Sequence, residues 1–455
     1  YYDADNDKKV DSVDPTMVAP LPAKKYIVFS HPALEAEAGV VWDADVDLDY
    51  SGYMIKTVGD TVFMKVNSHY GYQTVCLAFL REVIGYERYA EDTIAYSKDG
   101  SKMPTFDLVE KPDFDLVWRS GFISENGKTG SGVTNSRTFT YINGNFVHNS
   151  FDYLPYDVYG ESHRKWYSDV VTQLVHGGAG IGQLCYSAHG DKEEYALMVE
   201  NYVNKTIEFM KKKPNVDNIV LGQMDVIGND RVSRCTCASC NAAFSYYGDT
   251  NAGSHLALVN NVARGVAEWL ETEEAKTYFK EVAGIENKTM NVLVLVYGSS
   301  INPPVQRTDG GAILFDENGK GLPKQQKWFN VDDEGNVTEE DVLDENGNPV
   351  YLVCEPNADL FYCASSANYL HSFYEAENNA YSNMVKGWSG LGGNFYVWTY
   401  EVNYYNYMYP YNSYDSMLEN MRYFKNQKAN HLLYQGLWEN KNNAAFDKLR
   451  TYICS

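Results

Sequence analysis

Hydrophobic and polar positions follow two different rhythms along this chain of 455 residues. In residues 22–112 the apolar positions form short strand-like runs at 26–29, 52–56 and 61–66, followed by a helix-like pattern at 72–82. The last two runs flank a Val-Gly-Asp turn, which predicts a hairpin. We therefore predict a small α+β accessory domain at 22–112. The acidic residues 1–21 before it are expected to form a tail.

Beyond residue 112, apolar runs of strand length alternate with helix-like segments. The predicted strands are 116–119, 138–142 or 146–148, 182–185, 219–225, 291–297, 360–363, 395–400 and 431–435. The predicted helices are 192–212, 254–270, 367–388 and 416–426. Alternation of strands and helices over about 250 residues or more is typical of a TIM barrel. We therefore predict an α/β fold, a (β/α)8 TIM barrel at 113–455, with hairpins inserted at 309–350.

Polar and aromatic side chains occur where these strands end. The carboxyl ends of TIM-barrel strands meet at one rim, which carries the catalytic residues. The residues expected at this rim are Arg119, His148, Gln183, Asp225, Tyr297, Tyr400, Glu401 and Gln435. Asp225 and Glu401 are the candidate catalytic carboxylates, and Asp230 and Glu439 compete with them. The candidates for substrate binding are Arg119, His148, Gln223, Tyr297, Trp398, Tyr400, Asn403, Gln435 and Trp438. The structural alternatives are a helix cap or salt bridge for Asp225 and a solvated loop acid for Glu401.

Composition and motifs narrow the chemistry. The formal net charge of −23 argues against nucleic acid and anionic membrane surfaces as partners, and no apolar run approaches the roughly 18 residues of a membrane span. The sequence has no HExxH metal motif, no GxSxG nucleophile elbow and no phosphate-binding glycine loop. Aromatic residues make up 14% of the chain, and aromatic rings can stack on sugars. By elimination, carboxylate-driven glycoside chemistry without a required cofactor fits best.

Three cysteines at C-x-C-x-x-C spacing follow the strand predicted at 219–225, namely Cys235, Cys237 and Cys240. A structural zinc ion normally takes four ligands. The fourth ligand is then to be sought among Cys185, His189 and His255. The alternative is a disulfide, for instance between Cys235 and Cys240, with a free thiol beside it. In both cases we expect the cysteines to brace the loop after the strand and to take no part in catalysis.

Several motifs resemble a known family. QMD followed by CxCxxC and GSHLALVNNVA, and FYVWTYEVNYYNYMYPY followed by MLENMRYF and LLYQG, resemble glycoside hydrolase family 163. The earlier GYMIKTVGDTVFMKV and LAFLREVIG resemble the accessory domain that precedes hexosaminidase and glucuronidase barrels. The resemblance implies a bacterial, secreted or cell-surface endo-β-N-acetylglucosaminidase. Its expected partner is a complex N-glycan or glycoprotein, cut at the chitobiose core.

The mechanism that this resemblance implies is substrate-assisted retention. The 2-acetamido group of the substrate attacks the anomeric carbon and forms an oxazolinium ion, so the enzyme supplies an acid/base and a group that polarises the acetamide. Related hexosaminidases carry an adjacent Asp-Glu pair, whereas this chain has Met224-Asp225-Val226. The second group must then come from another strand, with Glu401 as the acid and Tyr297 or Tyr400 hydrogen-bonded to the acetamide.

Two other functions stay open. The small number of paired carboxylates is compatible with a non-catalytic carbohydrate-binding protein on a TIM-barrel scaffold. The resemblance of the first domain to those of glucuronidases is compatible with a glucuronidase-like exo-glycosidase. Release of a glycan from an N-glycoprotein distinguishes the hydrolase of N-acetylglucosaminides from both alternatives.

Overall fold

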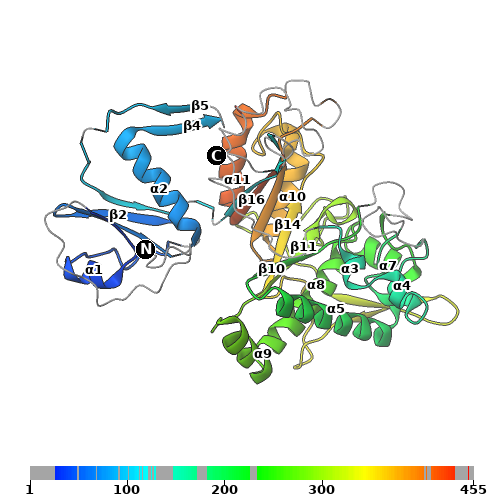
Figure 1. Cartoon of the computed structure of the whole chain (residues 1–455). Coiled ribbons are helices and arrows are strands. Elements are labelled where there is room, and N and C mark those ends of the chain that lie inside the picture. Colours follow the sequence, from blue (N-terminus) through cyan, green and yellow to red (C-terminus); the bar gives the residue numbers. More distant parts are fainter. Residues whose placement is uncertain are drawn as a thin grey trace. The chain divides into compact units, whose positions relative to one another are not determined.

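The computed structural model describes residues 26–48, 51–67, 69–90, 93–100, 102–111, 113–114, 116–120, 124–125, 128–129, 147–171, 182–225, 233–403, 406, 411–435 and 449. They form two compact units, the first with the described residues up to Leu116 and the second with those from Val117 onward (Figure 1). The tail predicted at 1–21 lies outside the described residues. No helix among the described residues combines the length and the apolar character needed to cross a membrane.

The first unit is an α+β domain with a four-stranded sheet in the order β1-β3-β2-β6. Its elements are β1 (Tyr26–Phe29), α1 (Pro32–Glu37), β2 (Tyr53–Val58), β3 (Thr61–Val66), α2 (His69–Ile84), β4 (Tyr86–Ala90), β5 (Thr93–Tyr96) and β6 (Asp107–Glu110). β2 and β3 pair antiparallel, which confirms the predicted hairpin. Val62 and Met64 alternate along β3 and point to one face, where they pack with Ile55 of β2 and Val75 of α2.

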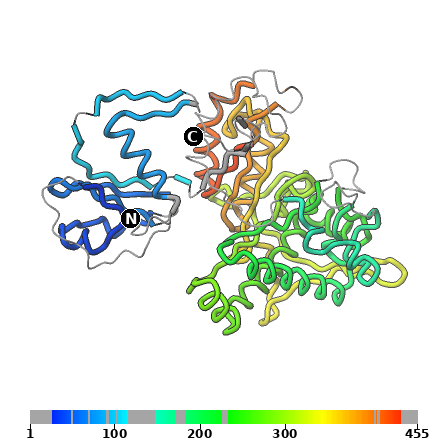
Figure 2. Tube along the Cα trace, viewed as in Figure 1, coloured from blue at the N-terminus to red at the C-terminus, as the bar shows by residue number. Residues whose placement is uncertain are grey.

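The second unit is built on a six-stranded sheet in the order β10-β11-β14-β15-β16-β7. Its strands are β7 (Leu116–Ser120), β10 (Asn218–Leu221), β11 (Asn291–Val296), β14 (Ala358–Cys363), β15 (Phe395–Tyr400) and β16 (Ala429–Gln435). The neighbours from β10 to β16 are all parallel and run side by side (Figure 2). Every residue of β14 and β15 is buried, as expected for a parallel sheet covered on both faces. The six strands predicted at these positions are confirmed, but β10 ends at Leu221, earlier than predicted.

The helices of the second unit are α3 (Ser150–Tyr153), α4 (Tyr156–Tyr159), α5 (Lys192–Lys212), α7 (Ala238–Tyr246), α8 (Ala252–Leu270), α9 (Glu273–Tyr278), α10 (Asn379–Ser389) and α11 (Tyr414–Asn426). Three of the four predicted helices are confirmed as α5, α8 and α11, and four helices that were not predicted, α3, α4, α7 and α9, accompany them. α5 has the predicted bounds, because Asp191 caps it by accepting two backbone N–H groups of its first turn. The helix predicted at 367–388 begins only with α10. Before it, the Asn378 amide donates to the carbonyls of Asn368 and Ser372 and holds a loop where a helix was predicted.

Among the described residues, the sheet lacks two of the predicted strands, the one at 138–142 or 146–148 and the one at 182–185. The range 138–142 lies outside the described residues, and residues 147–148 form a bend. Residues 182–185 contribute only an isolated antiparallel bridge to Tyr167, because the chain turns into the short helix η2 (Ala188–Gly190) before a ladder can form. The described part of the chain therefore shows an α/β fold with a parallel sheet. It does not show a closed barrel.

The insertion between β11 and β14 consists of hairpins, as predicted for 309–350. β12 (Lys327–Val331) and β13 (Val337–Asp341) pair antiparallel, and isolated bridges lie on both sides of them. Three glycines at the turns have φ of +73°, +83° and +80°, namely Gly319, Gly335 and Gly347. Glycine adopts this left-handed backbone without strain. β12 packs against α7, so the insertion covers the helix that contains the last cysteine of the motif.

Candidate functional site

Asp225 follows β10 at the carboxyl edge of the parallel sheet, and its side chain is 56% exposed. The residue that follows β11, Tyr297, donates its hydroxyl to Asp225 Oδ1 at 3.2 Å. His148 Nε2 lies 3.9 Å from the same oxygen. The carboxyl ends of parallel neighbours meet at one edge, which brings together residues far apart in the sequence. The result is an accessible carboxylate beside a phenol and an imidazole.

Gln223 positions both neighbours of Asp225. It is buried, and its Nε2 donates to the Tyr297 carbonyl at 2.5 Å. Its own carbonyl lies 2.9 Å from His148 Nδ1. A carbonyl only accepts, so His148 Nδ1 carries a proton and donates it to this carbonyl, while Nε2 is the ring nitrogen that faces Asp225. We call Asp225, Tyr297, His148 and Gln223 the Asp225 cluster.

Two further amides hold the backbone that carries Asp225. Gln183 donates to the Met224 carbonyl and accepts from the Met224 N–H, both at 2.9 Å. Asn149 donates to the Val220 carbonyl at 2.8 Å and accepts from the Gly222 N–H at 3.0 Å. Gln183 was among the predicted rim residues, whereas Asn149 was missed. A single loop amide has no periodic pattern by which the sequence would reveal it.

Glu401 has a different environment from Asp225. It follows β15, is only 1% exposed, and its backbone N–H donates to the Gln435 carbonyl at 2.9 Å. Burial, and after it the negative charge of Glu401, raises the pKa of Tyr369 well above its usual value. The Tyr369 ring lies 6.3 Å from that of Tyr400. Glu401 therefore lies in a buried aromatic environment, and its strand β15 is two strands away from β11, which leads to Tyr297.

The aromatic side chains at the end of β15 are packed on one another. Trp398 stacks between Phe361 and Tyr400, with ring centroids 5.6 and 5.5 Å away. Trp398 and Tyr400 are 9% and 8% exposed, so most of their surface is used in packing. Gln435 pairs in register with Tyr400 and is also buried. These residues form a second group, which is separated from the Asp225 cluster by β14.

Some predicted residues cannot be added to either group. Arg119 lies in β7, but its side chain is outside the described structure. Asp230, Trp438 and Glu439 also lie outside the described residues. Asn403 is described and is half-buried just beyond Glu401.

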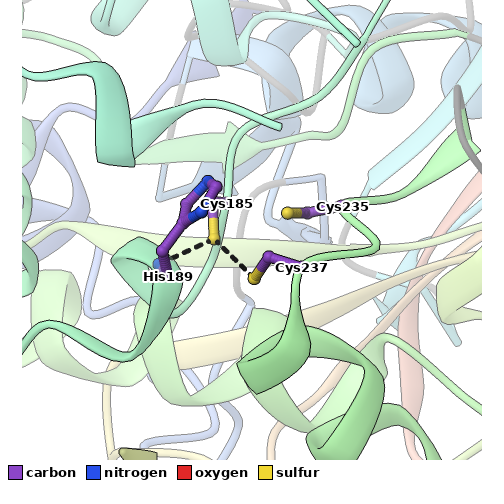
Figure 3. Close-up of side chains that lie close together, drawn as sticks. All are labelled: Cys185, His189, Cys235 and Cys237. Atoms are coloured by element: carbon purple, nitrogen blue, oxygen red, sulfur yellow. Dashed lines mark hydrogen bonds between the residues drawn. The ribbon is translucent and has the colours of Figure 1, made fainter. Parts of the chain in front are cut away.

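The three motif cysteines meet Cys185 in one buried group, which we call the thiol cluster. Cys185 Sγ lies 3.7 Å from Cys237 Sγ and 3.6 Å from Cys240 Sγ. Figure 3 shows the Cys235 side chain near those of Cys185 and Cys237. Hydrogen bonds from the neighbouring thiols, that of Cys185 first, lower the pKa of Cys237 well below its usual range. All four cysteines are free thiols. Cys185, suggested by the sequence as one of three possible partners, is therefore the fourth thiol.

The two histidines that were alternative partners differ in their placement. His189 lies beside the cluster (Figure 3), and one of its ring nitrogens is within 4.8 Å of the Cys185, Cys235 and Cys237 sulfurs. His255 is not in this group: its ring stacks on Tyr186 with centroids 4.5 Å apart, and its Nε2 bonds to the Leu221 carbonyl at 3.0 Å. His255 therefore supports the end of β10 and does not reach the thiols.

Comparisons with known proteins show the family of the chain. No curated protein matches it. Among solved structures it is similar to a GH138 enzyme targeting pectin rhamnogalacturonan II, with 10% identity and a TM-score of 0.35 over 95% of this chain. The chain spans about half the length of that structure, 50%. A family model described as a domain of unknown function, DUF4838, matches residues 60–278 and 345–455, which is more than half of the chain. The chain therefore belongs to the DUF4838 family.

Proposed function

We propose that this protein is a glycoside hydrolase that cleaves β-N-acetylglucosaminidic bonds within N-glycans, with the 2-acetamido group of the substrate as the nucleophile. The observation that carries the proposal is the Asp225 cluster, an exposed carboxylate at the carboxyl edge of a parallel sheet with a tyrosine and a histidine beside it. The motif resemblance to glycoside hydrolase family 163 supports the choice of substrate. The proposal locates the protein where N-glycans are met, secreted or at the cell surface.

Asp225 is the residue that orients the acetamide in this mechanism. As the acetamido oxygen attacks C1 and the leaving oxygen takes a proton, positive charge develops on the forming oxazolinium ion. A carboxylate that accepts the acetamido N–H stabilises this charge. The single hydroxyl proton of Tyr297 is donated to Asp225 Oδ1, so Tyr297 fixes the direction of the carboxylate.

Glu401 is the proposed acid, and it follows a strand that is not a neighbour of β10 in the sheet. β10 and β15 are three inter-strand spacings apart, roughly 14 Å. A retaining enzyme with a protein nucleophile keeps its two carboxyl groups only about 5 Å apart. The residue that follows β11, the neighbour of β10, is Tyr297 and not a second carboxylate, which is compatible with a nucleophile supplied by the substrate.

The proposed scaffold is a (β/α)8 barrel with the site at the carboxyl ends of its strands. Two observations support it. In the sheet, β7 as the first strand lies next to β16 as the last, which is the order that a closed barrel requires. β14 and β15 are also buried along their whole length, on the face that carries Trp398 as well as on the face that carries Val397.

The test is incubation of the full chain with a biantennary N-glycoprotein, followed by mass spectrometry of the protein and of the released glycans. We expect a released glycan and a protein that keeps one N-acetylglucosamine. An aryl β-N-acetylglucosaminide should be a far better substrate than the matching β-glucoside, because only the former carries the nucleophile. Release of terminal uronic acid alone would favour the glucuronidase-like exo-enzyme. Sugar binding without any release would favour the carbohydrate-binding protein.

A further inference from the structure

The thiol cluster gathers four potential metal ligands in one buried group. The Cys185, Cys235 and Cys237 sulfurs lie within 4.8 Å of one another, and the Cys240 sulfur contacts that of Cys185. Zinc–sulfur bonds of about 2.3 Å in tetrahedral geometry set neighbouring sulfurs about 3.8 Å apart. The two sulfur–sulfur distances from Cys185, 3.7 and 3.6 Å, agree with this value.

We propose that Cys185, Cys235, Cys237 and Cys240 together bind one structural Zn²⁺ ion as a tetrathiolate. All four side chains are at most 9% exposed, so the coordination shell is closed to water and substrate. Closed four-ligand sites are structural, whereas catalytic zinc keeps an open position. The proposal is independent of the glycosidase function.

Hydrogen-bond donors already surround the sulfurs. The His189 N–H donates to Cys185 Sγ at 3.1 Å (Figure 3), and the Cys240 N–H donates to Cys237 Sγ at 3.5 Å. The Ser187 hydroxyl lies 3.3 Å from Cys240 Sγ. Donors in these positions stabilise thiolates and orient them as ligands.

A buried cation beside the cluster matches the charge of such a site. Four thiolates and one Zn²⁺ carry a net charge of −2, and four protons are released when the site forms. Arg234 is 7% exposed, precedes Cys235, and donates to its carbonyl at 3.1 Å. Its guanidinium lies 3.9 Å from the centre of the Phe244 ring, and its Nε has no acceptor among the described residues. A buried cation is costly unless a negative charge lies near, and the tetrathiolate supplies one.

The ion would hold together segments on both sides of residues 226–232 in the sequence. The segment 182–190 contains Gln183, which binds the Met224 backbone, and Cys185, which meets the motif cysteines. Zinc would thus fix the motif cysteines to the same segment that holds Met224. This gives the cysteines a structural role in positioning the Asp225 cluster.

The experiment is metal analysis of the full chain purified from zinc-supplemented and from cobalt-supplemented medium. We expect one zinc ion per chain, and in the cobalt form the intense visible bands and sulfur-to-cobalt charge-transfer absorption of a tetrahedral thiolate site. Cys240→Ala should lower the zinc affinity, measured by chelator competition, at least about 100-fold, and Ser187→Ala about 10-fold. Cys363→Ala removes a buried thiol outside the cluster and should leave the zinc content unchanged.

His189→Ala separates the tetrathiolate from a site with three cysteines and one histidine. We expect full zinc content in this variant, and its loss would overturn the assignment of Cys240 as the fourth ligand. The cobalt spectrum of the unchanged chain keeps the proposal testable if a cysteine variant does not fold. Wild-type protein that contains no zinc, that holds iron and sulfide instead, or whose four thiols are oxidised to disulfides would refute the proposal.

Discussion

Two regions that follow β10 in the sequence have opposite environments. In the Asp225 cluster the carboxylate is 56% exposed, and hydrogen bonds between polar groups fix it. In the thiol cluster every sulfur-bearing side chain is at most 9% exposed, and the groups contact one another. After β10, the chain therefore contributes first an exposed residue that a ligand can reach, Asp225, and then buried cysteines that a ligand cannot reach.

This difference separates two roles that the sequence places side by side. An exposed carboxylate can touch a substrate, whereas buried thiols in mutual contact can only hold segments of the chain together. The segment 182–190 contacts both regions, through Gln183 on one side and Cys185 on the other. The clearest experiments change one region and measure the effect on the other.

The largest expected effect is that of Asp225→Asn on catalysis. The amide keeps the size of the side chain but loses the charge that stabilises the oxazolinium ion. We expect kcat for an aryl β-N-acetylglucosaminide to fall about 1,000-fold, or about 4 kcal/mol in activation free energy. The free energy of unfolding should change by less than about 0.5 kcal/mol, because the side chain is exposed.

Asp309→Asn is the matched control, because it removes a carboxylate of the insertion, outside both clusters. Its activity should equal that of the wild type. Equal losses in the two variants would show that Asp225 has no special role. Zinc content should be the same in both, which keeps the two regions distinct.

The parallel sheet was predictable from the sequence, because its strands are buried on both faces and appear as continuous apolar runs. The predicted and observed bounds of β15 coincide at Phe395–Tyr400, and those of α5 at 192–212. Local signals also set the hairpins of the insertion, where glycine occupies each left-handed turn. The loop before α10 was not predictable, since a side chain binding distant carbonyls decides it and leaves no local pattern.

The sequence could predict only those contacts of the site that follow from the order of neighbouring strands in the sheet. Asp225 and Tyr297 follow neighbouring parallel strands, so their meeting follows from the sheet. Glu401 is buried and lies near enough to Tyr369, from another part of the chain, to raise the pKa of that tyrosine, and residue spacing carries no information about this burial. Cys185 lies far from the motif in sequence, so the spacing that revealed three thiols left the fourth among several possibilities.

The next effect is a pH dependence of stability that depends on His255. This histidine joins the two regions, because it bonds to Leu221 at the end of β10 and stacks on Tyr186 beside Cys185. Burial lowers the pKa of His255 to about 4. The unfolded chain has a value of about 6.5, so the neutral ring stabilises the folded state fully above pH 6.5, and this contribution is lost as the pH falls through 4.

His255→Gln keeps an N–H donor and cannot be protonated in this pH range. Between pH 7 and pH 4, the free energy of unfolding should fall in both proteins, and we expect the fall in the variant to be smaller than that in the wild type by up to about 3 kcal/mol. Urea unfolding at several pH values measures this difference. Burial also lowers the pKa of His431, to about 3, so His431→Gln on strand β16 serves as the comparison for His255 on helix α8. An identical pH dependence in His255→Gln and wild type would contradict the prediction.

A smaller effect is expected from Gln183→Ala, which breaks the contact between segment 182–190 and the Asp225 backbone. The variant leaves the N–H and the carbonyl of Met224 without their partner, and we expect a loss of about 2 kcal/mol in unfolding free energy. kcat/KM should fall about tenfold, or about 1.4 kcal/mol, because Asp225 loses its fixed position.

Gln306→Ala is the control for this loss, because Gln306 donates one amide hydrogen bond to Pro323 within the insertion. It should cost less stability and leave kcat/KM unchanged. Retained zinc in Gln183→Ala would show that the two regions can be uncoupled. Unchanged kcat/KM in Gln183→Ala would instead show that Asp225 is held by other contacts.

The smallest effect is expected from Tyr297→Phe, which removes only the hydrogen bond to Asp225 Oδ1. The carboxylate keeps its charge but loses its direction, so kcat/KM should fall about fivefold, or about 1 kcal/mol. Tyr246→Phe removes a comparable hydroxyl, which donates to the Gln325 carbonyl in the insertion at 3.0 Å, and should leave kcat/KM unchanged. A loss in Tyr297→Phe as large as that in Asp225→Asn would mean that the phenol itself acts on the substrate. The orienting role would then belong to Tyr297 instead of the carboxylate.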